Sequence, residues 1–246
     1  MAEVIVVENL TIKFGSLTAV NNISFAVPEG IVFGFLGPNG SGKTSTVRTL
    51  CGIIPPTKGR AIVLGHDVKT EKNMAKQKIG YMSQKFSLYE DLTVAENIKF
   101  FARIYNLTPR EEKARLEEML SLSRLEGRER SRAGTLSGGM KQRLALGCSL
   151  VHSPKLLFLD EPTAGVDPVS RRAFWDIIKD LAQHGISIFL TTHYMDEADG
   201  CELLGFMYDG NLEEFGPPTE LKEMKDAGSL EDLFIRLVVE RNYMEV

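Results

Sequence analysis

Apolar residues occur in short runs through the first third of the chain, and turns containing glycine or proline separate these runs. Each run is rich in β-branched, aromatic and leucine side chains, a composition typical of strands. The expected strands cover residues 4–10, 23–27, 31–36, 61–64 and 79–82. Turns at Phe14-Gly15-Ser16 and Pro28-Glu29-Gly30 break the apolar pattern between the first three.

The pattern becomes helical between about residues 93 and 151. Thr93 with Glu96 three residues later has the spacing of a capping box, which predicts a helix start. A second helix is expected to begin at Pro109, supported by Glu111 and Arg115 at (i, i+4) spacing.

Strands and helices alternate again after Pro154. The expected elements are a strand over 156–159, a helix over 169–183, a strand over 186–190, a hairpin turn at Asp209-Gly210-Asn211 and helix from 219 onward. The pattern as a whole predicts an α/β core interrupted by a helical insert, without internal repeats.

Composition limits the classes of protein that fit. The chain has 246 residues, 43% hydrophobic and 25% charged, as in a soluble globular protein with a sizeable core. A net charge of −4 argues against nucleic acid as the main partner. The three cysteines, Cys51, Cys148 and Cys201, lack metal-site spacing and are expected to be reduced, mostly buried thiols of a cytosolic protein. No stretch approaches the roughly 18 apolar residues of a membrane span, so another chain would have to supply one.

A glycine-rich loop follows the strand expected over 31–36 and precedes a helix expected over 45–50. The loop consists of Gly37, Pro38, Asn39, Gly40, Ser41, Gly42, Lys43 and Thr44. In this context the pattern predicts a phosphate-binding P-loop, because glycines let successive N–H groups point at one anion and the helix start adds positive potential. Lys43 would reach the β- and γ-phosphates, and the Thr44 hydroxyl would bind Mg²⁺. An ordinary glycine-rich turn is the alternative.

Two acids end the apolar strand expected over 156–159. Asp160 is expected to hold Mg²⁺ through water, and Glu161 to orient and polarise the attacking water. The alternative is an Asp-Glu pair that merely opens a turn before Pro162.

A second anion-binding helix start is expected at Ser137-Gly138-Gly139, since Ser137 has the features of an N-cap and the glycines leave backbone N–H groups bare. Two such helix starts with one nucleotide per chain suggest that each site is built from two chains.

These motifs, in this order, resemble the ATP-binding subunit of an ATP-binding-cassette (ABC) transporter, over nearly the whole chain from residue 4 to about 220. The segments that carry the resemblance are the P-loop at 37–44, Gln84, the Leu-Ser-Gly-Gly signature at 136–140, the strand at 156–161, residues 164–167 and His193. The resemblance implies an α/β fold: a P-loop NTPase core over about 1–87 and 153–220, with an N-terminal antiparallel β-subdomain. It also implies an inserted helical subdomain over about 88–152 and a C-terminal helical extension over about 219–246.

The resemblance further implies ATP and Mg²⁺ as cofactors and gives roles to single residues. Gln84 would contact Mg²⁺ and the attacking water, His193 the γ-phosphate, and Asp167 the dimer interface. Phe14, where the family more often has Tyr, would stack on adenine with Val20 nearby, although Phe14 could instead be a core residue. The Asp167 loop reads Ala-Gly-Val where Ser-Ala-Leu is commoner.

The expected site residues fall into three groups. Expected catalytic residues are Lys43, Gln84, Glu161 and His193. Expected nucleotide-binding residues are Phe14, Val20, residues 37–44, Ser45, Gln84, Asp160 and His193, with Ser137, Gly138 and Gly139 serving the opposite subunit's ATP. Expected Mg²⁺ ligands are Thr44, Gln84 and Asp160.

Residues 81–93, 161–168 and 229–234 resemble bacterial multidrug exporters of the daunorubicin-resistance kind. That resemblance implies a peripheral subunit at the cytoplasmic face of the inner membrane. It would work as a homodimer, or as a pseudo-dimer with another ABC subunit, beneath a transmembrane permease. Some relatives carry two cassettes in one polypeptide, so this chain could be half of a longer protein. A soluble ABC ATPase acting on nucleic acid or ribosomes is the alternative, but the chain lacks the long coiled-coil insert or basic linker usual there, and no nucleic acid is expected.

The segment 85–91 carries Phe86, Leu88 and Tyr89. These apolar side chains are expected either to line a groove for a cytoplasmic helix of the permease or to pack the helical insert against the core.

Overall fold

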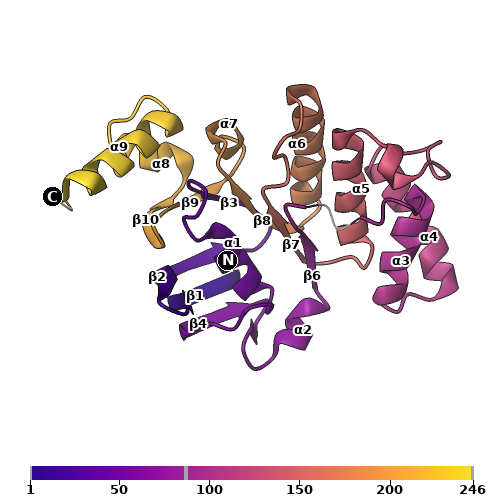
Figure 1. Cartoon of the computed structure of the whole chain (residues 1–246), viewed down its shortest axis with the longest axis horizontal. Coiled ribbons are helices and arrows are strands. Elements are labelled where there is room, and N and C mark those ends of the chain that lie inside the picture. Colours follow the sequence, from indigo (N-terminus) through magenta and orange to yellow (C-terminus); the bar gives the residue numbers. More distant parts are fainter. Residues whose placement is uncertain (1, 86–87, 245–246) are drawn as a thin grey trace.

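The computed structural model describes residues 2–85 and 88–244. Within these residues, six strands form a mainly parallel sheet in the order β10-β9-β3-β8-β7-β6, with β10 antiparallel to β9 (Figure 1). The strands are β3 (Val32–Leu36), β6 (Ile79–Met82), β7 (Leu156–Asp160), β8 (Ser187–Thr192), β9 (Leu203–Tyr208) and β10 (Asn211–Gly216). The predicted hairpin at Asp209-Gly210-Asn211 joins β9 to β10 and is confirmed.

A second, antiparallel sheet is built mostly from the N-terminal part of the chain, in the order β2-β1-β4-β5. Its strands are β1 (Glu3–Phe14), β2 (Leu17–Pro28), β4 (Lys58–Val63) and β5 (His66–Asp67). β1 and β2 are longer than predicted, because they pair along a hairpin that continues to Phe14 opposite Leu17. Pairing with a partner strand therefore extends both strands through the polar residues at which the apolar pattern stops.

Alternation along the parallel strands separates two cores. In β3, Phe33 and Phe35 point to the antiparallel sheet, whereas Val32 and Leu36 belong to the cluster on the other face. Helix α1 (Lys43–Leu50) buries Val47 and Leu50 in the first core, and α2 (Lys72–Lys76) precedes β6. The helices α6 (Pro168–Gln183), α7 (Met195–Ala198), α8 (Pro218–Met224) and α9 (Leu230–Met244) cover the opposite face (Figure 1).

The segment between β6 and β7 is helical, as predicted, and lies beyond the β6 edge of the sheet (Figure 1). It contains α3 (Val94–Ile104), α4 (Pro109–Leu122), the 3₁₀ turn Ala133–Thr135 and α5 (Gly138–Leu150). The capping box of Thr93 with Glu96 is confirmed, and Thr108 forms a second one with Glu111. The predicted pair of Glu111 with Arg115 is wrong within the described residues: Glu111 is used by the cap, and Arg115 Nε donates to the Val151 carbonyl at 2.8 Å.

The three cysteines are free and buried, as predicted, and burial raises the pKa of each thiol. Over the part of the chain that the structure describes, no helix has both the length and the apolar character to cross a membrane.

Candidate nucleotide site

The site lies where the carboxyl ends of β3, β6, β7 and β8 meet at one edge of the parallel sheet. The segments that follow these ends carry the P-loop, Gln84, the Asp160–Glu161 pair and His193. Ligands of open α/β sheets bind at this edge, because the loops from neighbouring parallel strands converge there. The topology thus brings together residues that are far apart in the sequence.

The P-loop leads into α1 through Gly42, whose φ of 105° is in the left-handed region. A Cβ at Gly42 would lie 2.5 Å from the Ala19 carbonyl oxygen and 3.2 Å from Val20 Cγ2, so only glycine fits beside β2. Gly42 offers no side chain to cap α1, and the positive end of the helix is therefore available to an anion.

Lys43 is 4% exposed, and its ammonium is fixed by close contacts. Nζ donates to the carbonyls of Gly37 at 2.7 Å and Pro38 at 2.9 Å, and lies 3.6 Å from Glu161 Oε1. Burial lowers the pKa of the Lys43 ammonium, while the charges of Glu161 and Asp160 act to raise it. These contacts fix the Lys43 ammonium within the loop that is predicted to bind phosphate.

Asp160 is buried at the end of β7, and its Oδ1 accepts two hydroxyl hydrogen bonds. Thr44 Oγ1 donates at 3.0 Å and Thr191 Oγ1 at 2.8 Å. Hydroxyl and carboxylate oxygens are suitable Mg²⁺ ligands, so Thr44 and Asp160 fit that ion. Within the described residues there is no cluster of three His, Cys, Asp or Glu side chains that could hold a metal alone. A Mg²⁺ bound here would therefore keep waters or phosphate oxygens as further ligands.

Glu161 is 8% exposed, and three of the expected catalytic side chains surround its carboxylate. Besides Lys43, Gln84 Nε2 donates to Oε2 at 2.9 Å, and His193 Nδ1 lies 3.5 Å from the same oxygen. The backbone of Glu161 has a φ of 48°, and its N–H donates to Thr191 Oγ1 at 3.0 Å. The carboxylate is therefore held in one place by contacts from the segments that follow β6 and β8 and from the P-loop.

A cleft of about 520 Å³ opens beside the P-loop, within the size range of small-molecule sites. It is lined by Phe14, Leu17, Ala19, Asn39, Gly40, Gly42, Lys43, Thr44, Ser45, Gln84 and Glu161. Phe14 is 46% exposed and Leu17 64%, so Phe14 is not a core residue. Val20 is fully buried and supports Gly42 from behind without lining the cleft.

The signature residues occupy a different place. Ser137 caps α5, as predicted, by accepting from the Met140 N–H at 3.3 Å. Ser137, Gly138 and Gly139 are not among the residues that line the cleft. A Cβ at Gly139 would lie 2.4 Å from Ser170 Oγ, so the start of α5 packs against the start of α6. Asp167 caps α6 by accepting from the N–H groups of Val169 and Ser170, which places it near the signature.

Several residues of the site were missed from the sequence. Leu17 follows directly on the Phe14-Gly15-Ser16 turn, and the available signal was an apolar residue beside a turn. Thr191 is a polar residue near the end of a buried strand, as Asp160 is, and that parallel was also available. Gln142 of α5, whose Nε2 donates to the Pro162 carbonyl at 2.8 Å, gave no such signal because only packing brings these elements together.

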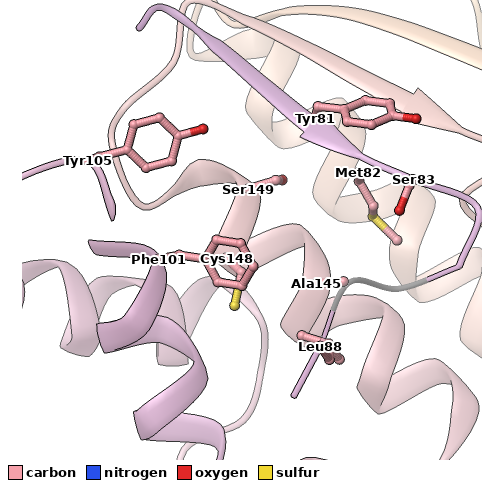
Figure 2. Close-up of a pocket in the computed structure, with 9 residues that line it drawn as sticks. All are labelled: Tyr81, Met82, Ser83, Leu88, Phe101, Tyr105, Ala145, Cys148 and Ser149. Atoms are coloured by element: carbon pink, nitrogen blue, oxygen red, sulfur yellow. The ribbon is translucent and has the colours of Figure 1, made fainter. Parts of the chain in front are cut away.

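A second, smaller cavity of about 50 Å³ lies between the sheet edge and the helical segment. Figure 2 shows its lining residues, which come from the β6 end, from α3 and α5, and from Leu88 and Tyr105 near them. Leu88 packs against the core, whereas Tyr89 is 48% exposed and meets the Phe100 ring edge-on at 4.5 Å. Phe86, the third apolar side chain predicted to line a groove, lies outside the described residues.

Comparison with known proteins agrees with this geometry. The family model described as ABC transporter matches residues 20–164. The probable multidrug ABC transporter ATP-binding protein YbhF of Escherichia coli is 44% identical over 241 residues, which are 96% of this chain and 42% of that protein. The linearmycin resistance ATP-binding protein LnrL of Bacillus subtilis is 40% identical over 215 residues, covering 87% of this chain and 69% of that protein.

Among solved structures, the dimeric structure of an ATP-binding cassette in a post-hydrolysis state, bound to ADP and Pi, is 26% identical with a TM-score of 0.78. The match covers 87% of this chain and 98% of that one. The chain thus spans less than half of YbhF but nearly all of a solved cassette. The matched model covers more than half of the chain and contains its P-loop, signature and Asp-Glu strand, and the chain therefore belongs to the ABC transporter family as an ATP-binding domain.

Proposed function

We propose that this chain binds and hydrolyses MgATP, and that hydrolysis powers export through a separate transmembrane subunit. The observation that carries the proposal is the convergence of Lys43, Gln84 and His193 on the Glu161 carboxylate, beside Thr44 and Asp160. The names of the compared relatives, a multidrug transporter protein and a linearmycin resistance protein, support export. Neither name supports the alternative action on nucleic acid.

The proposed mechanism assigns each group one task. The P-loop amides and Lys43 bind the phosphates, and the exposed faces of Phe14 and Leu17 contact the base. Thr44 and Asp160 would hold Mg²⁺, which would supply charge stabilisation at the phosphates. Glu161 accepts a hydrogen bond from the attacking water and draws its proton away, while Gln84 and His193 hold that carboxylate in position.

The test is Glu161→Gln, which preserves shape but removes the base. Turnover is expected to fall by about 10²–10⁴-fold, the usual contribution of a positioned acid or base, with ATP affinity unchanged. Glu126→Gln, at an exposed carboxylate, serves as the matched control and is expected to match wild type. If Glu161→Gln hydrolyses ATP at the wild-type rate, Glu161 is not the base.

A shared, two-chain site is part of the proposal. The signature residues lie away from the chain's own cleft, and the similar cassette described above is dimeric. A second copy, or another ABC subunit, would therefore bring its Ser137-Gly138-Gly139 segment to this chain's ATP.

The permease partner is proposed to dock at the exposed ring of Tyr89, which follows Leu88, a lining residue of the small cavity in Figure 2. Such docking would place the chain at the cytoplasmic face of the inner membrane. Tyr89→Ala should abolish co-purification with the permease while ATPase activity persists, whereas Ile104→Ala, at an exposed residue of α3, should not. Wild-type binding by Tyr89→Ala would exclude this surface.

A further inference from the structure

Glu197 is a buried carboxylate outside the nucleotide cleft. It belongs to the short helix α7, shortly after His193, and is 3% exposed. An ionised carboxylate is costly to bury unless it is paired and hydrogen-bonded. Its partners therefore indicate what the buried charge does.

Three segments of the chain meet at this carboxylate. Thr192 Oγ1, at the end of β8, donates to Oε2 at 2.6 Å. Thr163 Oγ1, in the turn that follows Glu161, donates to Oε1. Arg171 Nε, from α6, lies 3.9 Å from Oε1. The three segments are those that carry His193, Glu161 and the Asp167 cap.

Arg171 also connects Glu197 to His193, through the ring of Tyr194. Its guanidinium carbon lies 4.2 Å from the centroid of the Tyr194 ring, a cation–π distance. The Tyr194 ring centroid lies 4.1 Å from that of His193, whose Nδ1 is 3.5 Å from Glu161. Figure 1 shows α6 and α7 on the same face of the parallel sheet, as these contacts require.

We propose that Glu197 and Arg171 form a positioning clamp that keeps the Glu161 turn, the His193 strand end and the start of α6 in one arrangement. Neither side chain lines the cleft, so their effect reaches the reaction only through other residues. The inference rests on the proposed ATPase function and deepens it by naming residues that set the geometry of its catalytic pair.

The clamp also links the two sites of a dimer. Arg171 belongs to the start of α6, which packs against the start of α5. At this contact, a Cβ at Gly139 would lie 2.4 Å from Ser170 Oγ. The signature, proposed to serve the partner's ATP, is thereby connected through α6 to the turn that carries Glu161.

The experiment compares three variants of the full chain, each with ATP and Mg²⁺. Glu197→Gln can accept one threonine hydrogen bond through its amide oxygen and reverse the other by donating from its NH2, but it loses the charge that faces Arg171. Arg171→Met keeps a side chain of similar shape without the cation. Asp196→Asn is the matched control, because the 67%-exposed Asp196 side chain contacts the same guanidinium at 3.1 Å from the solvent side. The readouts are kcat, KM for ATP, thermal midpoint and the His193 ring resonances by NMR.

In Glu197→Gln and Arg171→Met, kcat should fall at least about tenfold with KM unchanged, since a displacement on the order of 1 Å can cost about 100-fold. The His193 resonances should shift in both variants but not in Asp196→Asn. The variant that carries both substitutions should be about as active as the less active of the two single variants, as expected of two residues acting as a unit.

Wild-type kcat in both variants, or unchanged His193 resonances, would overturn the clamp. A fall in kcat that simply follows a lowered thermal midpoint would overturn it too. If the wild-type chain hydrolyses no ATP, the proposed function fails, and the His193 resonances still decide whether Glu197 and Arg171 position that ring.

Discussion

Thr191 holds both acids of the site through one hydroxyl. It donates to Asp160 Oδ1 at 2.8 Å and accepts from the Glu161 N–H at 3.0 Å, and it is fully buried. A hydroxyl with these two partners fixes the end of β7 and the start of the turn that carries Glu161, the proposed base.

Thr191→Val replaces this hydroxyl by a methyl group of similar size. We expect a loss of about 1–3 kcal/mol in the free energy of unfolding, because the Thr191 partners lose a buried hydrogen bond. Turnover should fall about tenfold to 100-fold, since the acids shift relative to the phosphates. Urea unfolding and steady-state kinetics measure both, and Thr191→Ser should restore them. A fully active Thr191→Val variant would contradict the role of Thr191 in positioning Asp160 and Glu161.

His152 gives a prediction about pH. Its ring stacks on Tyr105 at 3.6 Å, and its Nε2 lies 2.9 Å from the Ile79 carbonyl. Burial lowers the pKa of His152 below its ordinary value of 6.5, with Arg115 acting in the same direction and the bond to Ile79 opposing it. Between the folded and unfolded pKa values the unfolded chain binds more protons, so the free energy of unfolding decreases as pH falls below about 6.5.

His152→Phe keeps a stacked ring without a titrating group. The free energy of unfolding of this variant should fall less steeply than that of wild type below that pH, measured by urea unfolding across the acid range. Parallel curves for the two proteins would show that His152 has the same pKa in both states.

At the scale of elements, a buried hydrogen bond between side chain and backbone joins α5 to the turn that follows β7. Gln142 is fully buried and donates to the carbonyl of Pro162, next to Glu161. A rotation of the helical segment would therefore act directly on the turn that carries the proposed base.

Gln142→Leu should lower the free energy of unfolding by about 1–3 kcal/mol, because the Pro162 carbonyl is left without its buried donor. Lys141 lies on the same helix as Gln142, and Lys141→Gln, which removes its ion pair with Glu90, should cost no more than about 1 kcal/mol. The thermal unfolding midpoints of the two variants are compared. Equal midpoints would show that the hydrogen bond of Gln142 contributes little to stability.

At the scale of the whole molecule, the separation of signature and cleft predicts complementation. Lys43→Ala should abolish productive ATP binding, since a cation beside phosphate contributes several kcal/mol even at an effective dielectric constant of about 20. Ser137→Arg should leave ATP binding intact and remove hydrolysis, because a bulky cation would occupy the signature.

Mixing the two inactive variants leaves one intact composite site per heterodimer, and ATPase activity should partly return. A colorimetric phosphate assay on the mixture measures it, with each variant alone as control. If Ser137→Arg is fully active by itself, the signature has no part in the site.

Local signals were sufficient for much of the fold. Lys43 and Thr44 could be assigned to a P-loop because the glycine pattern, the preceding apolar strand and the following helix are all features of consecutive residues. The capping box predicted at Thr93 likewise depends on spacing within one turn of helix, and the one at Thr108, which was not predicted, has the same spacing. Asp160 ends a strand whose residues are all buried and Glu161 follows it, so their position at the sheet edge was implied by the apolar run.

Contacts between distant segments were decided only by the tertiary structure. Thr191, Gln142 and Glu197 act through partners that lie 5 to 34 positions away along the chain, and no periodic pattern marks such pairs. The length of β1 and β2 depended on their pairing with each other, and the place of Val20 behind Gly42 on the packing of β2 against the P-loop. The sequence by itself determined which residues are proposed to bind phosphate, because the glycine pattern and the elements that flank it are local. The tertiary structure decided which side chains hold those residues in place, because packing alone brings them together.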